Sequence, residues 1–132
     1  MQIREASFGA ALPVDGYGPG FFRVAGAVHE GGLLIRAERA EPWGGYADLA
    51  PLLALEGLVD LLFVGTGAEI AFLPKAFQRE LEAIGIMAEP MATPSAARSY
   101  NVLLSEGRRV AAALLPMPGA LPLAVPPAVP GA

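Results

Sequence analysis

Cysteine is absent from the 132-residue chain, and histidine occurs only once, as His29. Without cysteine the chain has no disulfide, no thiolate metal ligand and no thiol nucleophile. A zinc or iron site would consist almost wholly of carboxylates, which these metals seldom accept alone. No serine has a histidine partner in the sequence that suggests a catalytic triad. We therefore expect no metal, no cofactor and no catalytic residue.

Long apolar runs and basic stripes are also missing. Hydrophobic residues make up 54% of the chain, but no run approaches the roughly 18 residues that a membrane-spanning helix needs. The opening MQIREASF lacks the apolar core of a secretory signal. With a net charge of −4, eight arginines and one lysine, the chain is a poor candidate for binding nucleic acid. We expect a cytoplasmic protein of one domain.

The first third of the chain reads as β-structure. In FFRVAGAVHEGGLLIRAER, two apolar runs flank His29-Glu30-Gly31-Gly32, and paired glycines suit a tight hairpin turn. The second run alternates Leu33, Ile35 and Ala37 with more polar neighbours, which predicts a strand with one buried face. These features predict an antiparallel hairpin that adds a second sheet or extends the first.

From Asp48 onward the period changes to that of helices alternating with strands. Asp48 is expected to cap a short helix that has Pro51 in its first turn. A second helix is expected from Pro74, and a third with Thr93 as its N-cap. Apolar strands are expected after each helix, at residues 59–64, 86–91 and 108–115. Three strands separated by helices predict a small parallel sheet with right-handed crossovers.

The chain changes character at residue 116. Residues 116–132 hold six prolines and no charged side chain, which excludes a helix or a central strand. We interpret residues 1–115 as a single α/β domain and residues 116–132 as a flexible, Pro-rich tail.

A strand followed by glycines, LLFVGTG, raises the question of a phosphate-binding loop. Gly65, Thr66 and Gly67 follow the apolar strand, and Glu89 lies at the distance at which dinucleotide-binding proteins place a ribose-binding acid. Against this, Ile70 replaces the third glycine, and the next helix begins too late for its dipole to act on Gly67. The sequence favours a tight turn and leaves nucleotide or anion binding as an alternative.

Three further side chains are candidates for the same site. Arg98 and Asn101 are three residues apart on a predicted helix, so they can converge on an anion or a backbone segment. Glu89 can bind that helix start or pair with Arg98. The alternative is an ordinary helix surface with structural ion pairs. The candidate ligand-binding set is therefore Gly65, Thr66, Gly67, Glu89, Arg98 and Asn101.

Several stretches together resemble one known family. The series YGPGFFRVAGAVHEGGLLI, Trp43, DLLFVGTGAEIAFLP, GIMAEPMAT and ARSYNVLLSEGRRVAAAL looks like mitochondrial complex I assembly factor 3 and its uncharacterised bacterial and archaeal relatives. The resemblance covers residues 16–115. It differs in Ser99, where the family usually has threonine, and in the Pro-rich tail, which has no counterpart.

The resemblance implies a fold and a role. The implied fold is a three-layer β/β/α architecture with a central parallel sheet and a second antiparallel sheet. The mitochondrial members assist assembly of NADH:ubiquinone oxidoreductase without known catalysis. We thus expect a non-enzymatic interaction or assembly protein that has protein partners and associates peripherally with membrane complexes. The alternative is a small-molecule-binding protein or enzyme that uses the crevice at Gly65–Gly67; neither the identity of a partner nor the oligomeric state follows from the sequence.

Overall fold

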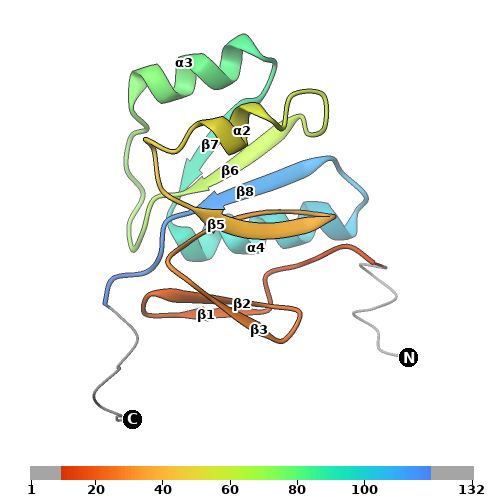
Figure 1. Ribbon diagram of the computed structural model, residues 1–132, viewed down its shortest axis with the longest axis vertical. Coiled ribbons are helices and arrows are strands. Elements are labelled where there is room, and N and C mark those ends of the chain that lie inside the picture. The colour runs from red at the N-terminus through yellow and green to blue at the C-terminus, as the bar shows by residue number, and fades with distance from the viewer. Residues whose placement is uncertain (1–9, 120–132) are drawn as a thin grey trace.

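The computed structural model describes residues 10–119 and contains two sheets and three helices in that range. The smaller sheet is antiparallel, with the strands in the order β1–β2–β3. The larger sheet is mixed, with the order β5–β4–β8–β6–β7 (Figure 1). The elements in chain order are β1 (Gly16–Gly18), β2 (Phe21–Val24), β3 (Ala27–Glu30), β4 (Gly32–Arg36), β5 (Arg39–Trp43), α2 (Ala50–Leu53), β6 (Leu61–Gly65), α3 (Lys75–Ala83), β7 (Met87–Met91), α4 (Thr93–Ser105) and β8 (Val110–Leu114).

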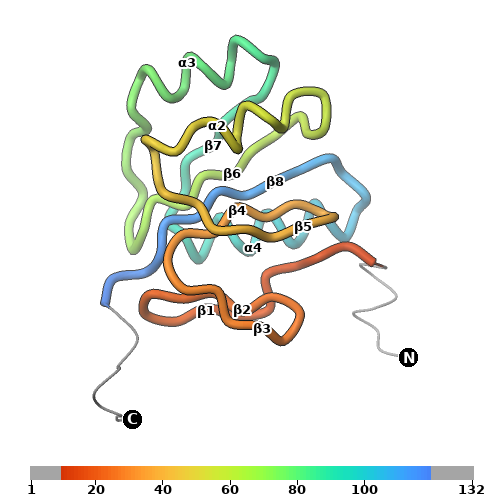
Figure 2. Tube along the Cα trace, viewed as in Figure 1, coloured from red at the N-terminus to blue at the C-terminus, as the bar shows by residue number. Residues whose placement is uncertain are grey.

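The larger sheet forms the centre of three layers. Strands β8, β6 and β7 are parallel, as the alternation of helices and strands predicts, and β4 joins β8 antiparallel. Helices α2 and α3 lie on one face of this sheet, while α4 lies on the other face together with the smaller sheet (Figures 1 and 2). The expected β/β/α architecture is confirmed. The antiparallel region both extends the parallel sheet, through β4 and β5, and forms the second sheet.

Period-2 alternation divides the central strands between two cores. In β6, Leu62 and Val64 pack against α2 and α3, whereas Phe63 packs against α4. In β8, Ala111 and Ala113 face the first core while Val110 and Ala112 face the second. Because both faces are covered, these strands are apolar throughout, as is usual in sheets that carry helices on each side. For the same reason β4 buries both of its faces, not the one that its alternation predicts.

The predicted hairpin turn at residues 29–32 is wrong. Strand β2 pairs with β3 through a turn at Ala25 and Gly26, and His29 lies inside β3, opposite Phe22. Gly31, with φ +81°, lets the chain leave the smaller sheet and enter the larger one as β4. The glycine signal is therefore correct for a sharp change of direction, but the two flanking strands do not pair with each other.

Both predicted helix caps also differ from the structure. Helix α2 begins after Leu49, and the Asp48 carboxylate instead accepts the Gly44 N–H at 2.8 Å. Helix α4 begins after Ala92, so Thr93 is already helical and does not cap the helix with its side chain. Helix α3 begins after Pro74 as predicted. Among the described residues no helix has the length and apolarity needed to cross a membrane.

The start of the described chain is held on α4 by two side chains. The Tyr100 hydroxyl donates to the Leu12 carbonyl at 2.7 Å. The Asn101 amide pairs with both backbone groups of Val14, accepting its N–H at 2.8 Å and donating to its carbonyl at 2.9 Å. Residues 116–119, the first part of the predicted tail, lie beside the smaller sheet, where Met117 bridges to Pro19. The remainder of the tail lies outside the described residues.

Tyr100 makes stability sensitive to alkaline pH. Burial raises the pKa of its phenol above the ordinary value of 10.0, and the nearby Glu38 adds to the effect. The folded state therefore keeps a proton that the unfolded chain loses near pH 10. The resulting stabilisation is complete below pH 10 and is lost as the pH rises above it, at up to about 1.4 kcal/mol per pH unit.

Replacing Tyr100 with phenylalanine should flatten this alkaline loss. At pH 7, Tyr100→Phe should cost about 1–2 kcal/mol, because the Leu12 carbonyl loses its donor. Urea unfolding at neutral and alkaline pH measures both effects, with Tyr17→Phe at a half-exposed site as the control. Burial also raises the pKa of Tyr46, so some alkaline dependence remains. An unchanged slope in Tyr100→Phe would contradict this assignment.

Candidate functional site

The Gly65–Gly67 turn is held together by Thr66. Its N–H donates to the Met91 carbonyl at 2.8 Å, which ties the turn to the end of β7. Its hydroxyl lies 2.7 Å from the Glu69 carbonyl and 3.1 Å from that of Met91, and it accepts the Ala71 N–H at 3.1 Å. Thr66 thus fixes the conformation of the loop that runs from β6 to α3.

Thr93 forms a second, buried anchor for the same turn. Its side chain is fully buried, and its hydroxyl accepts the Gly67 N–H at 2.9 Å and donates to the Leu115 carbonyl at 2.7 Å. The Thr93 N–H in turn donates to the Gly67 carbonyl at 2.7 Å. One residue therefore links the turn after β6, the start of α4 and the end of β8.

The two glycines are needed for different reasons. A Cβ on Gly65 would lie 2.7 Å from the Thr93 hydroxyl and 2.9 Å from a Leu114 methyl, so a side chain has no room there. Gly67 has open space around it but adopts φ +102°, which other residues rarely tolerate.

These bonds bear on the phosphate hypothesis. A phosphate loop offers its backbone N–H groups to the anion. Here the N–H groups of Thr66 and Gly67 are already donated to Met91 and Thr93. Helix α3 begins only at Lys75. The geometry favours a structural turn, and ligand binding at this loop stays a prediction.

The other three predicted site residues each have different surroundings. Asn101 uses its amide to hold Val14, whereas Arg98 is exposed and lines a hollow with Met91 and Val102. Glu89 is exposed on β7, opposite Phe63 in the sheet register. Within residues 10–119 no ion pair joins Glu89 to Arg98. Convergence of Arg98 and Asn101 on one anion stays a prediction.

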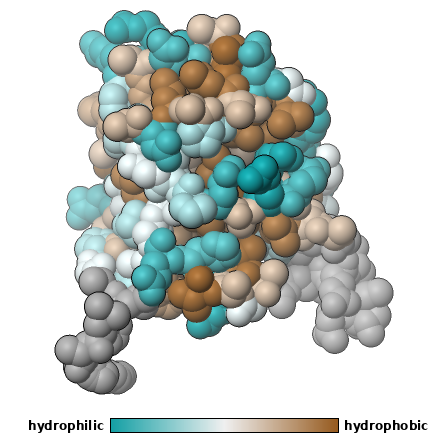
Figure 3. All heavy atoms as spheres, in the orientation of Figure 1, coloured by the Kyte–Doolittle hydropathy of each residue, from teal (hydrophilic) through white to brown (hydrophobic). Residues whose placement is uncertain are grey.

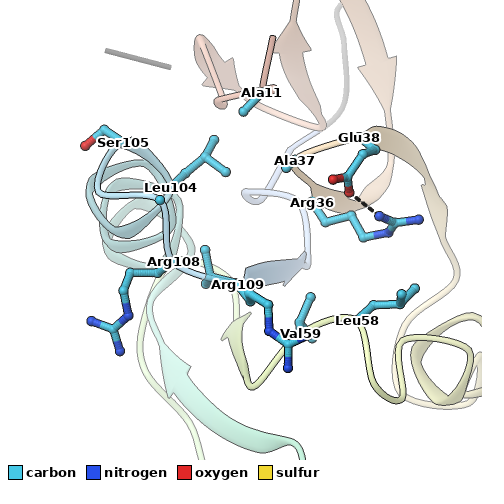
Figure 4. Close-up of a pocket in the computed structure, with 12 residues that line it drawn as sticks. Ala11, Arg36, Ala37, Glu38, Leu58, Val59, Leu104, Ser105, Arg108 and Arg109 are labelled. Atoms are coloured by element: carbon cyan, nitrogen blue, oxygen red, sulfur yellow. Dashed lines mark hydrogen bonds and ion pairs between the residues drawn. The ribbon is translucent and has the colours of Figure 1, made fainter. Parts of the chain in front are cut away.

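A second hollow, of about 440 Å³, has Arg36, Arg108 and Arg109 among its lining residues. Arg36 and Glu38 form an ion pair at its edge, and Arg108 points away from the other charged groups in Figure 4. Arg109 pairs with Asp60 at 2.8 Å. This pairing lowers the pKa of the Asp60 carboxyl and raises that of the Arg109 guanidinium. These arginines therefore do not converge on a shared anion.

The loop after the turn displays two large apolar side chains, which sequence reasoning missed. Ile70 is 66% exposed and Phe72 is 99% exposed. On the face seen in Figure 3, apolar residues lie interspersed among hydrophilic ones, so the surface is not uniformly polar. The signal in the sequence was present as EIAFLP, an apolar segment that follows a turn before a helix begins. Among the described residues no group of three or more metal-ligating side chains lies close enough to hold an ion.

The sequence of the chain matches a defined family. Residues 14–115 match the family described as "Protein of unknown function (DUF498/DUF598)", and the chain belongs to it. The resemblance noted in the sequence is thereby confirmed.

The relatives include an uncharacterised bacterial protein and animal proteins that are named as assembly factors. An uncharacterised protein of Rhodobacter capsulatus is 72% identical over 94% of this chain and its own full length. NADH dehydrogenase [ubiquinone] 1 alpha subcomplex assembly factor 3 of zebrafish (Danio rerio) is 33% identical, over 89% of this chain and 72% of its own length. The solution structure of a Bordetella pertussis protein with an Mth938-like domain superposes with a TM-score of 0.72 at 28% identity, covering 91% of this chain and 95% of its own.

Removing the Thr93 hydroxyl should destabilise the fold while leaving its shape intact. Thr93→Val keeps the volume but leaves the Gly67 N–H and the Leu115 carbonyl without partners, at a cost of about 2–4 kcal/mol. Thr93→Ser retains the hydroxyl and should lose much less. Urea unfolding of both variants measures the difference. Equal losses in the two would show that the hydroxyl does not hold the turn.

Proposed function

We propose that this protein is a non-enzymatic assembly factor that assists the assembly of NADH:ubiquinone oxidoreductase, and that it contacts its partner through Ile70 and Phe72. Two observations support the proposal. Family members named as assembly factors for NADH dehydrogenase [ubiquinone] align over most of the chain. The exposed Phe72 stands on a loop that Thr66 holds in one conformation.

The exposure of Phe72 is the observation that carries the proposal. A phenylalanine left in water forgoes about 1.5–3 kcal/mol that burial would contribute. Ordinary loops place polar residues at such positions, whereas contact surfaces use aromatic residues as anchors. Because hydrogen bonds of Thr66 already order the loop, a partner that buries Phe72 loses little conformational entropy. The loop therefore has the properties of a preorganised contact.

The alternative is a nucleotide or anion at Gly65–Gly67. Such a ligand would compete with Thr93 and Met91 for the N–H groups of the turn. The positive case for protein contact, an apolar loop tip supported by internal bonds, is therefore stronger than the case for a ligand. Purified protein tested with NAD, NADP, ATP and phosphate separates the two, since saturating ligand raises the melting temperature.

Phe72→Ser should abolish the assembly role without unfolding the protein. The side chain is exposed, so the free energy of unfolding should change by less than about 0.5 kcal/mol. The variant is expressed in a host whose own copy of the gene is deleted. The amount of assembled enzyme on native gels and the NADH:quinone activity of membranes should stay at the level of the deletion.

Val28→Ser serves as the matched control, because Val28 is 49% exposed on β3 and belongs to a different surface. It should restore assembly fully. A deletion strain with normal amounts of the enzyme would refute the assembly role. Full rescue by Phe72→Ser would retain the role but place the contact elsewhere.

A further inference from the structure

One side of the molecule, formed by β7 and α4, has an apolar strip that nothing in residues 10–119 covers. A hollow of about 450 Å³ lies there, lined by Phe63, Met91, Arg98, Ser99, Val102 and Leu103. Beside it, Met87 is 63% exposed, and Val102 on its rim is 49% exposed. Met87 shares the sheet face of Phe63, because Leu61 and Phe63 pair with Met87 and Glu89 in register.

Strand β7 is an edge of the larger sheet, but it is a poor template for another strand. The Met87 N–H and the Met91 carbonyl bond toward β6, so the backbone groups of Ala88 and Pro90 face outward. Pro90 has no N–H to donate, which prevents a complete ladder at this edge. A partner that covers this side must therefore bind the side chains on the α4 face and not extend the sheet.

The strip carries one exposed charge of each sign. Glu89 is exposed on the strand side, and Arg98 is exposed on the helix side. Neither has an ion-pair partner within the part of the chain that the structure describes. A surface that carries an acid on its strand side and a base on its helix side is complementary to itself after a two-fold rotation.

We propose that this face binds a second copy of the same chain about a two-fold axis. Glu89 of each copy lies opposite Arg98 of the other, and the apolar side chains of both strips pack around the two ion pairs. A second copy supplies the matching order of charges by symmetry, whereas an unlike protein would have to carry that order on its own surface. Self-complementarity therefore favours a second copy. The proposal does not depend on the assembly role, and Phe72 is not part of the hollow's lining.

Charge reversal tests this arrangement. By symmetry, Glu89→Arg places Arg opposite Arg twice, and Arg98→Glu places Glu opposite Glu twice. Each single variant should raise the dissociation constant of the dimer by at least about tenfold. Sedimentation velocity over a concentration series measures this change, and circular dichroism confirms that both variants are folded.

Mixing the two variants is the decisive experiment. In a heterodimer of Glu89→Arg with Arg98→Glu, both cross-interface pairs have opposite signs again, so the mixture should dimerise where neither variant does alone. If Glu89 paired with Arg98 of its own chain, mixing the two variants would not restore dimerisation. Arg79→Glu and Glu80→Arg, exposed on α3, are the matched controls and should dimerise like the unaltered protein, alone or mixed.

Three results would overturn the proposal. The unaltered protein remaining a monomer at every concentration would show that a second copy does not cover this face. A dimer unaffected by either charge reversal would place its interface elsewhere. Single variants that dissociate but do not combine when mixed would show that Glu89 and Arg98 do not face each other. None of these results would decide whether Phe72→Ser abolishes the assembly role.

Discussion

The hydroxyl group of Thr93 is the interaction on which the rest of the structure depends. It joins the turn after β6 to the end of β8, while its backbone begins α4. Three elements that are distant in sequence therefore meet at one fully buried polar group. Gly65 must lack a side chain because its Cβ would lie only 2.7 Å from that hydroxyl. The glycine turn is, in this account, a consequence of packing around Thr93 and a support for the loop beyond it.

That support connects the structural turn to the contact surface that we propose. Thr66 orders the loop through its hydroxyl, and the loop carries Ile70 and Phe72 outward. An exposed apolar side chain weakens solubility unless a partner covers it for part of the time. This loss of solubility is consistent with the proposal that the loop binds a partner protein. In this account the turn supports the loop that carries Ile70 and Phe72, and this role needs no ligand.

Much of the fold follows from sequence periodicity, because buried strands and amphipathic helices leave regular apolar patterns. The parallel order of β6, β7 and β8 and the start of α3 at Pro74 were predictable in this way. The separation of β3 and β4 into different sheets was not, since Gly31 signals a turn without revealing that the chain enters another sheet. Likewise, Thr93 has the side chain of a helix cap, and only tertiary packing diverts its hydroxyl to Gly67 and Leu115. The stretch EIAFLP marks an apolar segment before α3, but the exposure of Phe72 also depends on which residues surround the loop, and that is set by the tertiary fold.

The central claim is that the loop after the glycine turn contacts a protein during assembly of NADH:ubiquinone oxidoreductase. A photo-crosslinking amino acid placed at position 72 in living cells tests it most directly, with position 28 on β3 as the reference. The account predicts a covalent adduct from position 72 that contains a subunit of that enzyme, identified by mass spectrometry, and none from position 28. Equal crosslinking from both positions, or adducts from position 72 that never contain such a subunit, would contradict the account.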